Sequence, residues 1–336
     1  MERTFTDLGR IEAIRLLFEG TGYAPFGEPL RFEASPQECI ATVPVLLLEG
    51  IDFDLIYFPL RHLGRKAVLR AAGELSAVMA HPEMLSVQLG ISAKLDFPQV
   101  QELWQGIAVT AREYGFRHLC LDLLPSRNGL TIALSAAGRH SAAVSSARPK
   151  AQSKDLICVS GALGAAFLGL QVLERERVKF DRGAQDRKEL EQYRMLVGAY
   201  LRPEIDPQTV TQLVRSGITP SHGYLVTRGL ADALLRLTRD SGLGAKVYAD
   251  KIPFEGGSFA LGKELDMDPV SAAMNGGEDC KLLYVVPIAQ YERLCADFRS
   301  FDIIGHMALP EAGTVLVSPD GLEHRVSAQG WNPAIQ

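Results

Sequence analysis

The stretch of sequence that decides the fold is NGGEDCKLLYVVP, residues 275–287. Two glycines and two carboxylates, Gly276-Gly277-Glu278-Asp279, lead directly into the apolar run Leu282–Val286. Glycines favour tight turns, and a short apolar run ended by a proline is typical of a buried strand. The pattern therefore predicts a turn that opens onto a core strand, with two acids placed next to a site. The alternative for these acids is a structural turn with helix-capping chemistry.

The segments around this motif alternate between helix and strand patterns. The C-terminal half predicts strands at 156–159 and 245–248 and helices after Gly164, at 229–239 and at 269–274. The N-terminal half predicts helices at 7–20, 62–80 and 96–115 and strands at 41–48, 84–92, 118–124 and 130–137. The polar, aperiodic segment Ser145–Ser153 predicts a domain boundary. We expect an α/β (α+β) protein with domains at 1–148 and 149–336.

Composition and charge exclude several classes of protein. The chain is 47% hydrophobic and 22% charged, which is typical of globular proteins. Its 336 residues are enough to form two domains, each with its own hydrophobic core. A net charge of −5 argues against a nucleic-acid binder, whose affinity would rest on a basic surface. No apolar run reaches the roughly 18 residues that span a bilayer. Five scattered cysteines without a C-x-x-C pair indicate free thiols. A cytoplasmic protein without membrane contact is expected.

The motif at 276–287 resembles the GGEDYELLF-V-P signature of the thiamine-monophosphate kinases, which are related to aminoimidazole-ribonucleotide synthetase. Further similarities follow in the order of that family. Val159–Gly164 is similar to its T/S-G-x-L-G turn, Leu201–Pro203 to its L-x-R-P stretch, Ser241–Ala245 to its S-G-V-G-A stretch and Ile304-Gly305 to its terminal I-G. Each is weak alone, and their shared order over most of the chain carries the resemblance.

The resemblance implies a magnesium site built from aspartates of five motifs, of which three positions here keep an acid. Glu38 lies in the paired-aspartate box, Glu74 replaces the aspartate of N-L-S-D-L-A-A-M-G-A, and Asp122 is the acid of G-G-D-T. These three are the candidate metal ligands, because magnesium takes oxygen ligands that converge from several loops. For Glu74, an ion pair with Arg70 one helical turn away is an equal alternative. Asp122 lies in a strand-like run, where a carboxylate must be paired or solvated.

The other motif positions have lost their acids. Val45 stands where T-D-hydrophobic-L-V-E-G has its aspartate, and Leu225 and Arg228 stand at the two aspartates of D-I-S-D-G. A guanidinium stays charged at all relevant pH values. At about 4 Å and an effective dielectric constant near 20, it would repel a divalent ion by roughly 8 kcal/mol. We therefore expect the usual metal cluster not to form, and hypothesise that Arg228 pairs with Asp122 or Glu74 in the place of the ion.

The resemblance also implies a fold, a ligand and a partner. The N-terminal domain would pair its strands with a second copy, giving a dimer-spanning sheet or barrel, and the C-terminal domain would be α/β. ATP would lie next to the site for thiamine phosphate. The candidate cofactor-binding residues are then Asp122, Arg228, Gly276, Gly277, Glu278 and Asp279.

Three functions follow from the resemblance and its missing acids. The first is a catalytically degenerate relative with a binding or structural role. The second is an active kinase that uses Mg and ATP to convert thiamine monophosphate to the diphosphate. The third is nucleotide binding without metal, with Arg228 as a phosphate clamp. The lost aspartates favour the first function.

Overall fold

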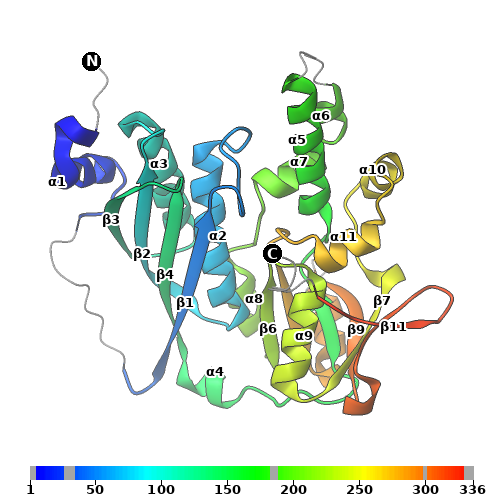
Figure 1. Cartoon of the computed structure of the whole chain (residues 1–336). Helices are drawn as coiled ribbons and strands as arrows, with labels where there is room; N and C mark the ends of the chain where they lie inside the picture. The colour runs from blue at the N-terminus through cyan, green and yellow to red at the C-terminus, as the bar shows by residue number, and fades with distance from the viewer. Residues whose placement is uncertain (1–4, 26–34, 182–187, 298–300, 329–336) are drawn as a thin grey trace. The chain divides into compact units, whose positions relative to one another are not determined.

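The computed structural model describes residues 5–25, 35–181, 188–297 and 301–328. The chain forms two compact units, an N-terminal unit of Met1–Ser146 and a C-terminal unit of Ala147–Gln336 (Figure 1). Each unit contains one β-sheet with its own helices, so the mixed α/β class expected from the sequence is confirmed. Within the described residues, no helix is long and apolar enough to cross a membrane.

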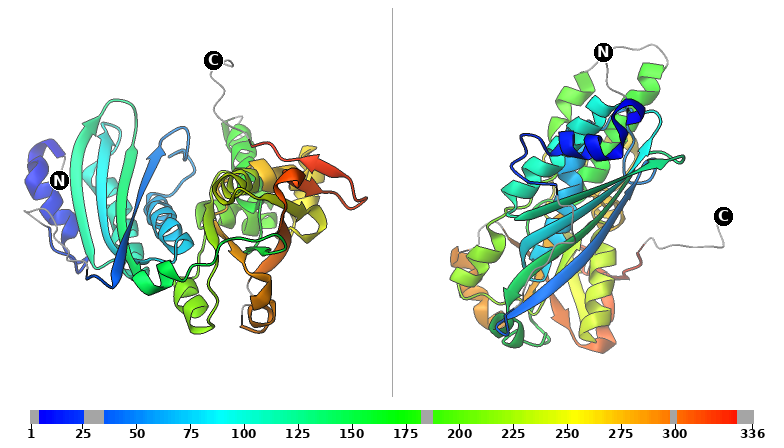
Figure 2. Two further views of the ribbon diagram at one scale, coloured as in Figure 1. Left: turned by 90° about the horizontal axis from the view of Figure 1, so that it is seen from below. Right: turned by 90° about the vertical axis from the view of Figure 1, so that its left-hand side faces the viewer.

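The N-terminal unit is built on a four-stranded sheet with the order β1-β4-β2-β3. Its strands are β1 (Glu38–Leu48), β2 (His81–Ser92), β3 (His118–Ser126) and β4 (Thr131–Ser141). The β2–β3 pair is parallel and the other pairs are antiparallel. The helices are α1 (Phe5–Phe18), α2 (Leu60–Ala77), α3 (Phe97–Glu113) and the short α4 (Ala142–Ser146). Helix α2 packs on the sheet and α3 packs along α2, as the views in Figures 1 and 2 show.

The sheet of one chain is open. Strands β1 and β3 form opposite edges, separated by β4 and β2, so the described strands do not close into a barrel. One face is buried under the helices, because Leu47, Ile132, Leu89 and Leu123 share a row across the four strands and are at most 5% exposed. One chain thus forms no barrel, and the dimer-spanning sheet or barrel implied by the resemblance would need a second copy of the chain.

Local sequence patterns in this unit hold in the structure. On β2, Leu85 and Val87 are fully buried while Ser86 and Gln88 are partly exposed, as a period of two requires. Helix α3 begins with the expected capping box, since Asp96 accepts from the N–H of Gln99 and the Gln99 side chain accepts from the N–H of Asp96.

The C-terminal unit is built on a seven-stranded mixed sheet with the order β11-β10-β7-β9-β5-β8-β6. Its strands are β5 (Leu156–Val159), β6 (His222–Val226), β7 (Gly244–Tyr248), β8 (Lys281–Val286), β9 (Asp302–Ala308), β10 (Thr314–Val317) and β11 (Glu323–Arg325). Its α-helices are α5 (Ala165–Asp181), α6 (Lys188–Gln192), α7 (Arg194–Leu201), α8 (Thr209–Arg215), α9 (Leu230–Ser241), α10 (Ser258–Leu265), α11 (Pro269–Asn275) and α12 (Tyr291–Asp297). The expected apolar strand after the double glycine is β8, in the interior of this sheet.

Two apolar clusters hold the C-terminal unit together. The larger one packs α9 against the sheet, with fully buried Leu234 and Leu237 against Val247 and Val285. The smaller one joins α5, α7 and α10 through residues such as Leu168, Leu196 and Leu261. Helix α11 contacts both α9 and α5, so the chain that leaves it toward β8 is fixed between the two clusters.

Candidate functional site

The two acids of the double-glycine motif have different environments. Asp279 is only 3% exposed, and its carboxylate accepts hydrogen bonds from the backbone N–H groups of Gly164 at 2.8 Å and Ala166 at 3.1 Å. The first N–H groups of a helix have no partner within the helix, so Asp279 caps the N-terminus of α5 from a distant segment. Burial raises the pKa of Asp279 to about 7, against the opposing effect of the two N–H donors.

The glycines of the motif allow two loops to pack closely. A Cβ on Gly276 would lie 2.5 Å from the carbonyl oxygen of Ala272, and one on Gly277 would lie 2.9 Å from that of Thr227. Gly277 also has a φ of +79°, which favours glycine. The next residue, Glu278, has a φ of +69° and donates its N–H to the Thr227 carbonyl at 2.9 Å. Gly277 thus seats the turn before β8 against the loop between β6 and α9, while Gly276 lies against Phe167 of α5.

The same contact places Arg228 beside the motif. The Cα of Arg228 lies 3.4 Å from the position that a Cβ of Gly277 would take, and the Arg228 side chain is exposed. On the other side of Arg228, Gly229 has a φ of +88° and approaches Met274, whose carbonyl oxygen would lie 2.3 Å from an added Cβ. The structure therefore brings together five of the candidate cofactor-binding residues, namely Arg228, Gly276, Gly277, Glu278 and Asp279.

A cavity of about 350 Å³ lies next to this motif within the C-terminal unit. Asp279 and Lys281 belong to its wall together with Ala162 and Ala165 at the start of α5. The remaining wall comes from α7, the segment after it and the loop before α10, contributing Arg194, Met195, Gly198, Ala199, Arg202, Pro203, Glu204 and Glu255. The sequence patterns did not indicate Arg194 as a site residue, because it lies in the charged stretch 174–194, which is typical of a solvated surface.

In the N-terminal unit, the retained acid Asp122 is paired with a cation. Arg10 on α1 donates to the Asp122 carboxylate through both Nε, at 3.1 Å, and Nη2. The two side chains are 56% and 43% exposed, so water also reaches the pair. Arg10 lies 112 residues away in the sequence, outside every motif, and no pattern in the sequence connected the two.

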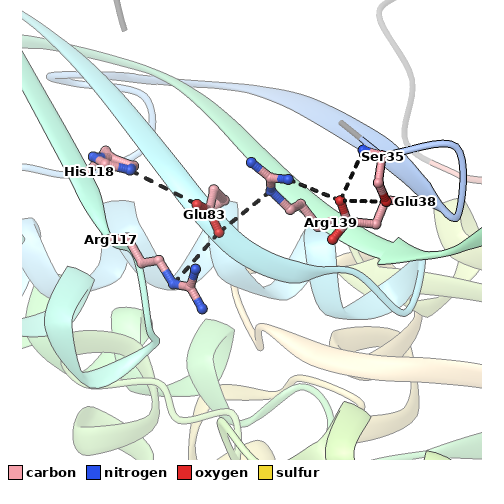
Figure 3. A network of polar contacts seen from close by, with 6 residues as sticks. All are labelled: Ser35, Glu38, Glu83, Arg117, His118 and Arg139. Carbon is pink, nitrogen blue, oxygen red and sulfur yellow. Dashed lines mark hydrogen bonds and ion pairs between the residues drawn. The ribbon is translucent and has the colours of Figure 1, made fainter. Parts of the chain in front are cut away.

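Glu38 belongs to a different polar network, shown in Figure 3. Arg139 donates to the Glu38 carboxylate at 3.1 Å, and the N–H and hydroxyl of Ser35 donate to the same oxygen at 3.2 Å. The Ser35 N–H, followed by Arg139, lowers the pKa of Glu38. Arg139 also lies 3.8 Å from Glu83, which is 8% exposed and has Arg117 and His118 within 4 Å on its other side.

The sheet register shows that Glu38 and Asp122 are far apart within one chain. Asp122 is in register with Gln88, Ala133 and Leu46 across the four strands, so its row meets β1 at Leu46. Glu38 lies eight residues before Leu46, which corresponds to roughly 26 Å along a strand. The two acids therefore do not converge on one ion within a chain.

The third candidate ligand, Glu74, lies on α2 and is partly exposed. Arg70, one helical turn before it, donates to the carboxylate of Asp52 at 3.0 Å. Asp52 also accepts from the N–H of Leu48, so this acid holds the end of β1 to α2. Asp52 was not a sequence candidate, although it lies in the retained tail of the second motif.

The described residues do not fit a carboxylate-bound magnesium ion. Asp122 and Glu38 each pair with an arginine of their own unit through one carboxylate oxygen, and a cation in that place repels a metal ion. Over residues 5–25, 35–181, 188–297 and 301–328, no group of three or more His, Cys, Asp or Glu side chains is placed to hold a metal.

Comparison with known proteins relates this arrangement to a family. No family model matches the chain. A thiamine-monophosphate kinase from Pyrococcus horikoshii is 24% identical over 329 residues, covering 97% of this chain and 96% of the kinase. A putative hydrogenase expression/formation protein from Methanocaldococcus jannaschii is 25% identical over 295 residues, covering 82% and 81%. The chain is a distant homologue of the thiamine-monophosphate kinases and hydrogenase-formation proteins.

Solved structures of such proteins share the fold of this homologue. The structure described as AaThiL complexed with AMPPCP and TMP superimposes with a TM-score of 0.72 at 21% identity, covering 97% of both chains. The hydrogenase maturation protein HypE in complex with ATP gives a TM-score of 0.70 at 19% identity, covering 99% of this chain and 95% of the other. The family resemblance inferred from the motifs is therefore confirmed at the level of distant homology.

Proposed function

We propose that this protein is a catalytically degenerate relative of the thiamine-monophosphate kinases that binds a phosphate-bearing ligand without magnesium-dependent phosphoryl transfer. The observation that carries the proposal is the Arg10–Asp122 pair. Asp122 keeps the acid of its motif, yet its carboxylate faces a guanidinium of the same unit. Both contacts of Arg10 go to Oδ1 of Asp122, so a magnesium ion bound to that oxygen would have to displace the guanidinium, and an ion beside it would be repelled by the positive charge.

The remaining motif positions support the same conclusion. Phosphoryl transfer depends on metal ions that neutralise charge on the phosphates, and those ions need several converging carboxylates. Val45 and Leu225 offer no ligand atoms, and Arg228 offers a positive charge. Val45 lies in the sheet row next to that of Asp122, so an apolar residue occupies a position where the motif has an acid.

The proposed ligand is a nucleotide or a thiamine phosphate. The relatives support this class, because one solved structure is described with AMPPCP and TMP and another with ATP. In this chain, the exposed Arg228 is held against Gly277 and beside Glu278. A guanidinium there can clamp a phosphate through two parallel hydrogen bonds, which replaces the metal in neutralising charge.

The proposed partner is a second copy of the chain. On the face of the four-stranded sheet away from its buried row, Ile40, Leu46 and Leu124 are 39%, 54% and 56% exposed. Large apolar side chains on one open face favour burial against another surface. Light scattering with size exclusion tests this partner, and a Leu46→Glu variant should shift a dimer toward the monomer. A monomer in the parent protein would refute the dimer.

The test of the proposed function is a thermal-shift titration with ATP, in excess magnesium and separately in chelator. A ligand that binds the native state raises Tm by mass action. We expect equal shifts under both conditions and no conversion of thiamine monophosphate to the diphosphate. Arg228→Ala should abolish the shift, while Arg215→Ala, an exposed arginine on α8, should retain it.

Each other outcome is informative. A shift that requires magnesium, together with diphosphate formation, would show an active kinase with rebuilt metal ligands and would refute the degenerate site. Absence of a shift with ATP and with thiamine monophosphate would refute ligand binding and leave a structural role.

A further inference from the structure

Three cations line the cavity of the C-terminal unit, and within the described residues two of them, Lys281 and Arg202, form no ion pair. Lys281 is partly buried, and the one hydrogen bond of its ammonium within the described residues goes to the carbonyl oxygen of Glu204, at 3.4 Å. In the same described set, the guanidinium of Arg202 makes no hydrogen bond or ion pair. Arg194, the third cation of the wall, has only a long, exposed contact of 3.7 Å with Glu191.

Two of the three acids of the cavity wall, Asp279 and Glu255, accept hydrogen bonds from backbone N–H groups, and the third, Glu204, is exposed. The Asp279 carboxylate is bound by two N–H groups of α5, and Glu255 accepts from the N–H of Gly256 at 3.0 Å. Burial raises the pKa of Asp279 and the charge of nearby Lys281 opposes that rise, but the Lys281 ammonium forms no ion pair in the described residues, so its desolvation is only partly offset. Lys281 and Arg202 therefore present unused positive charge and hydrogen-bond donors to the cavity.

The floor of the cavity leaves room for a ligand of limited size. It is lined by small residues, Ala162, Ala165, Gly198 and Ala199. Gly161 lies beside the Lys281 stem, since a Cβ there would be 3.6 Å from Cε. A volume of about 350 Å³ is near the lower end for small-molecule sites, which begin at roughly 300 Å³. The start of α5 also meets this wall, where Asp279 already accepts from the N–H groups of Gly164 and Ala166.

We infer that this cavity is a binding site for a small phosphate monoester, with Lys281 and Arg202 holding the phosphate and Arg194 at the rim. Glu204 and Glu255 on the same wall accept hydrogen bonds, so the ligand carries hydroxyl or amino donors beside its phosphate. The site lies within the C-terminal unit and uses neither Arg228 nor Asp122, so it does not depend on the proposed function.

The experiment uses inorganic phosphate as the probe, with chloride at matched ionic strength as its reference. On the full chain, amide chemical shifts and Tm are followed as phosphate is added. We expect a saturable response, with shift changes concentrated at Ala162, Ala165, Gly198 and Ala199. Lys281→Met keeps the aliphatic stem, and with Arg202→Ala it should weaken phosphate binding at least tenfold, since each removes a charge-assisted contact.

Two controls keep the inference open to refutation. Arg215→Ala removes an exposed cation elsewhere in the unit and should leave phosphate affinity unchanged. The Lys281→Met/Arg202→Ala variant should keep the ATP-induced shift, whereas Arg228→Ala should lose it and still bind phosphate. A non-saturable response equal to that of chloride, or unchanged affinity in the double variant, would overturn the inference. If the double variant does not fold, the location of the shift changes in the parent protein decides.

Discussion

The carboxylate of Asp279 and the backbone N–H of Gly164 are joined by a 2.8 Å hydrogen bond that spans 115 residues of sequence. This bond connects the segment just before β8 to the start of α5, and a second bond to Ala166 strengthens the connection. Asp279 of the double-glycine motif therefore holds two distant segments of the C-terminal unit together. The motif carries a structural role whatever ligand the protein binds.

Removing this cap should destabilise the protein clearly. Asp279→Ala leaves two buried N–H groups without acceptors, and we expect a loss of about 2–4 kcal/mol in the free energy of unfolding. Urea denaturation measures the change. Asp268→Ala is a matched control, because Asp268 caps α11 through the N–H groups of Val270 and Ser271 but is exposed, so about 1 kcal/mol is expected. Equal losses in the two variants would contradict the buried role of Asp279.

The raised pKa of Asp279 predicts a pH dependence of stability. The group has a pKa of about 7 in the folded protein and 3.8 as its ordinary value. Between these values the folded state keeps a proton that the unfolded chain has lost, so the contribution of Asp279 to stability decreases as the pH rises toward and through 7. Asp279→Asn has no such proton. The stability of the parent protein relative to this variant should fall between pH 5 and pH 8, and a constant difference would refute the raised pKa.

Patterns close in the sequence predicted the structure well. The capping box of Asp96 and Gln99 involves residues three apart, and the alternation of Leu85, Val87 and Leu89 follows from the geometry of one strand. Both depend on the spacing of residues within one helix or one strand, and that spacing can be counted directly in the sequence.

Contacts between distant segments were not predictable in this way. Arg10 reaches Asp122 only because α1 contacts β3, and the N–H groups that bind Asp279 belong to a helix that begins more than 100 residues earlier. Helical spacing suggested Glu74 as a partner of Arg70, and it gave no sign that Arg70 also donates to Asp52 from outside the helix. Such pairs depend on the topology of the fold, which brings distant segments together. The local periodicity of the sequence does not reveal this topology.

The close approach at Gly229 predicts a large cost for a single methyl group. Gly229→Ala would place its Cβ 2.3 Å from the carbonyl oxygen of Met274 and would also require a φ of +88°. Gly242 has a φ of +68° at the C-terminal end of α9, but an added Cβ there meets nothing within 4 Å. Gly242→Ala should therefore lose only the conformational part, about 1 kcal/mol, and Gly229→Ala at least about 2 kcal/mol more. Thermal unfolding compares them, and equal losses would contradict the interlocked loops.

The Arg70–Asp52 and Arg10–Asp122 pairs of the N-terminal unit should differ in strength because their exposure differs. The side chains of Arg70 and Asp52 are 10% and 20% exposed, whereas those of Arg10 and Asp122 are 56% and 43% exposed. Asp52→Asn removes the carboxylate of a largely buried ion pair, so we expect a loss of about 2–4 kcal/mol. Asp122→Asn should change stability by about 1 kcal/mol or less, since water and salt screen an exposed pair.

Chemical denaturation at low and high salt measures the stability loss of both variants, with a salt effect expected mainly at Asp122. A larger loss in Asp122→Asn would show that this pair is shielded from water, for example by a second copy of the chain on the open face of the sheet.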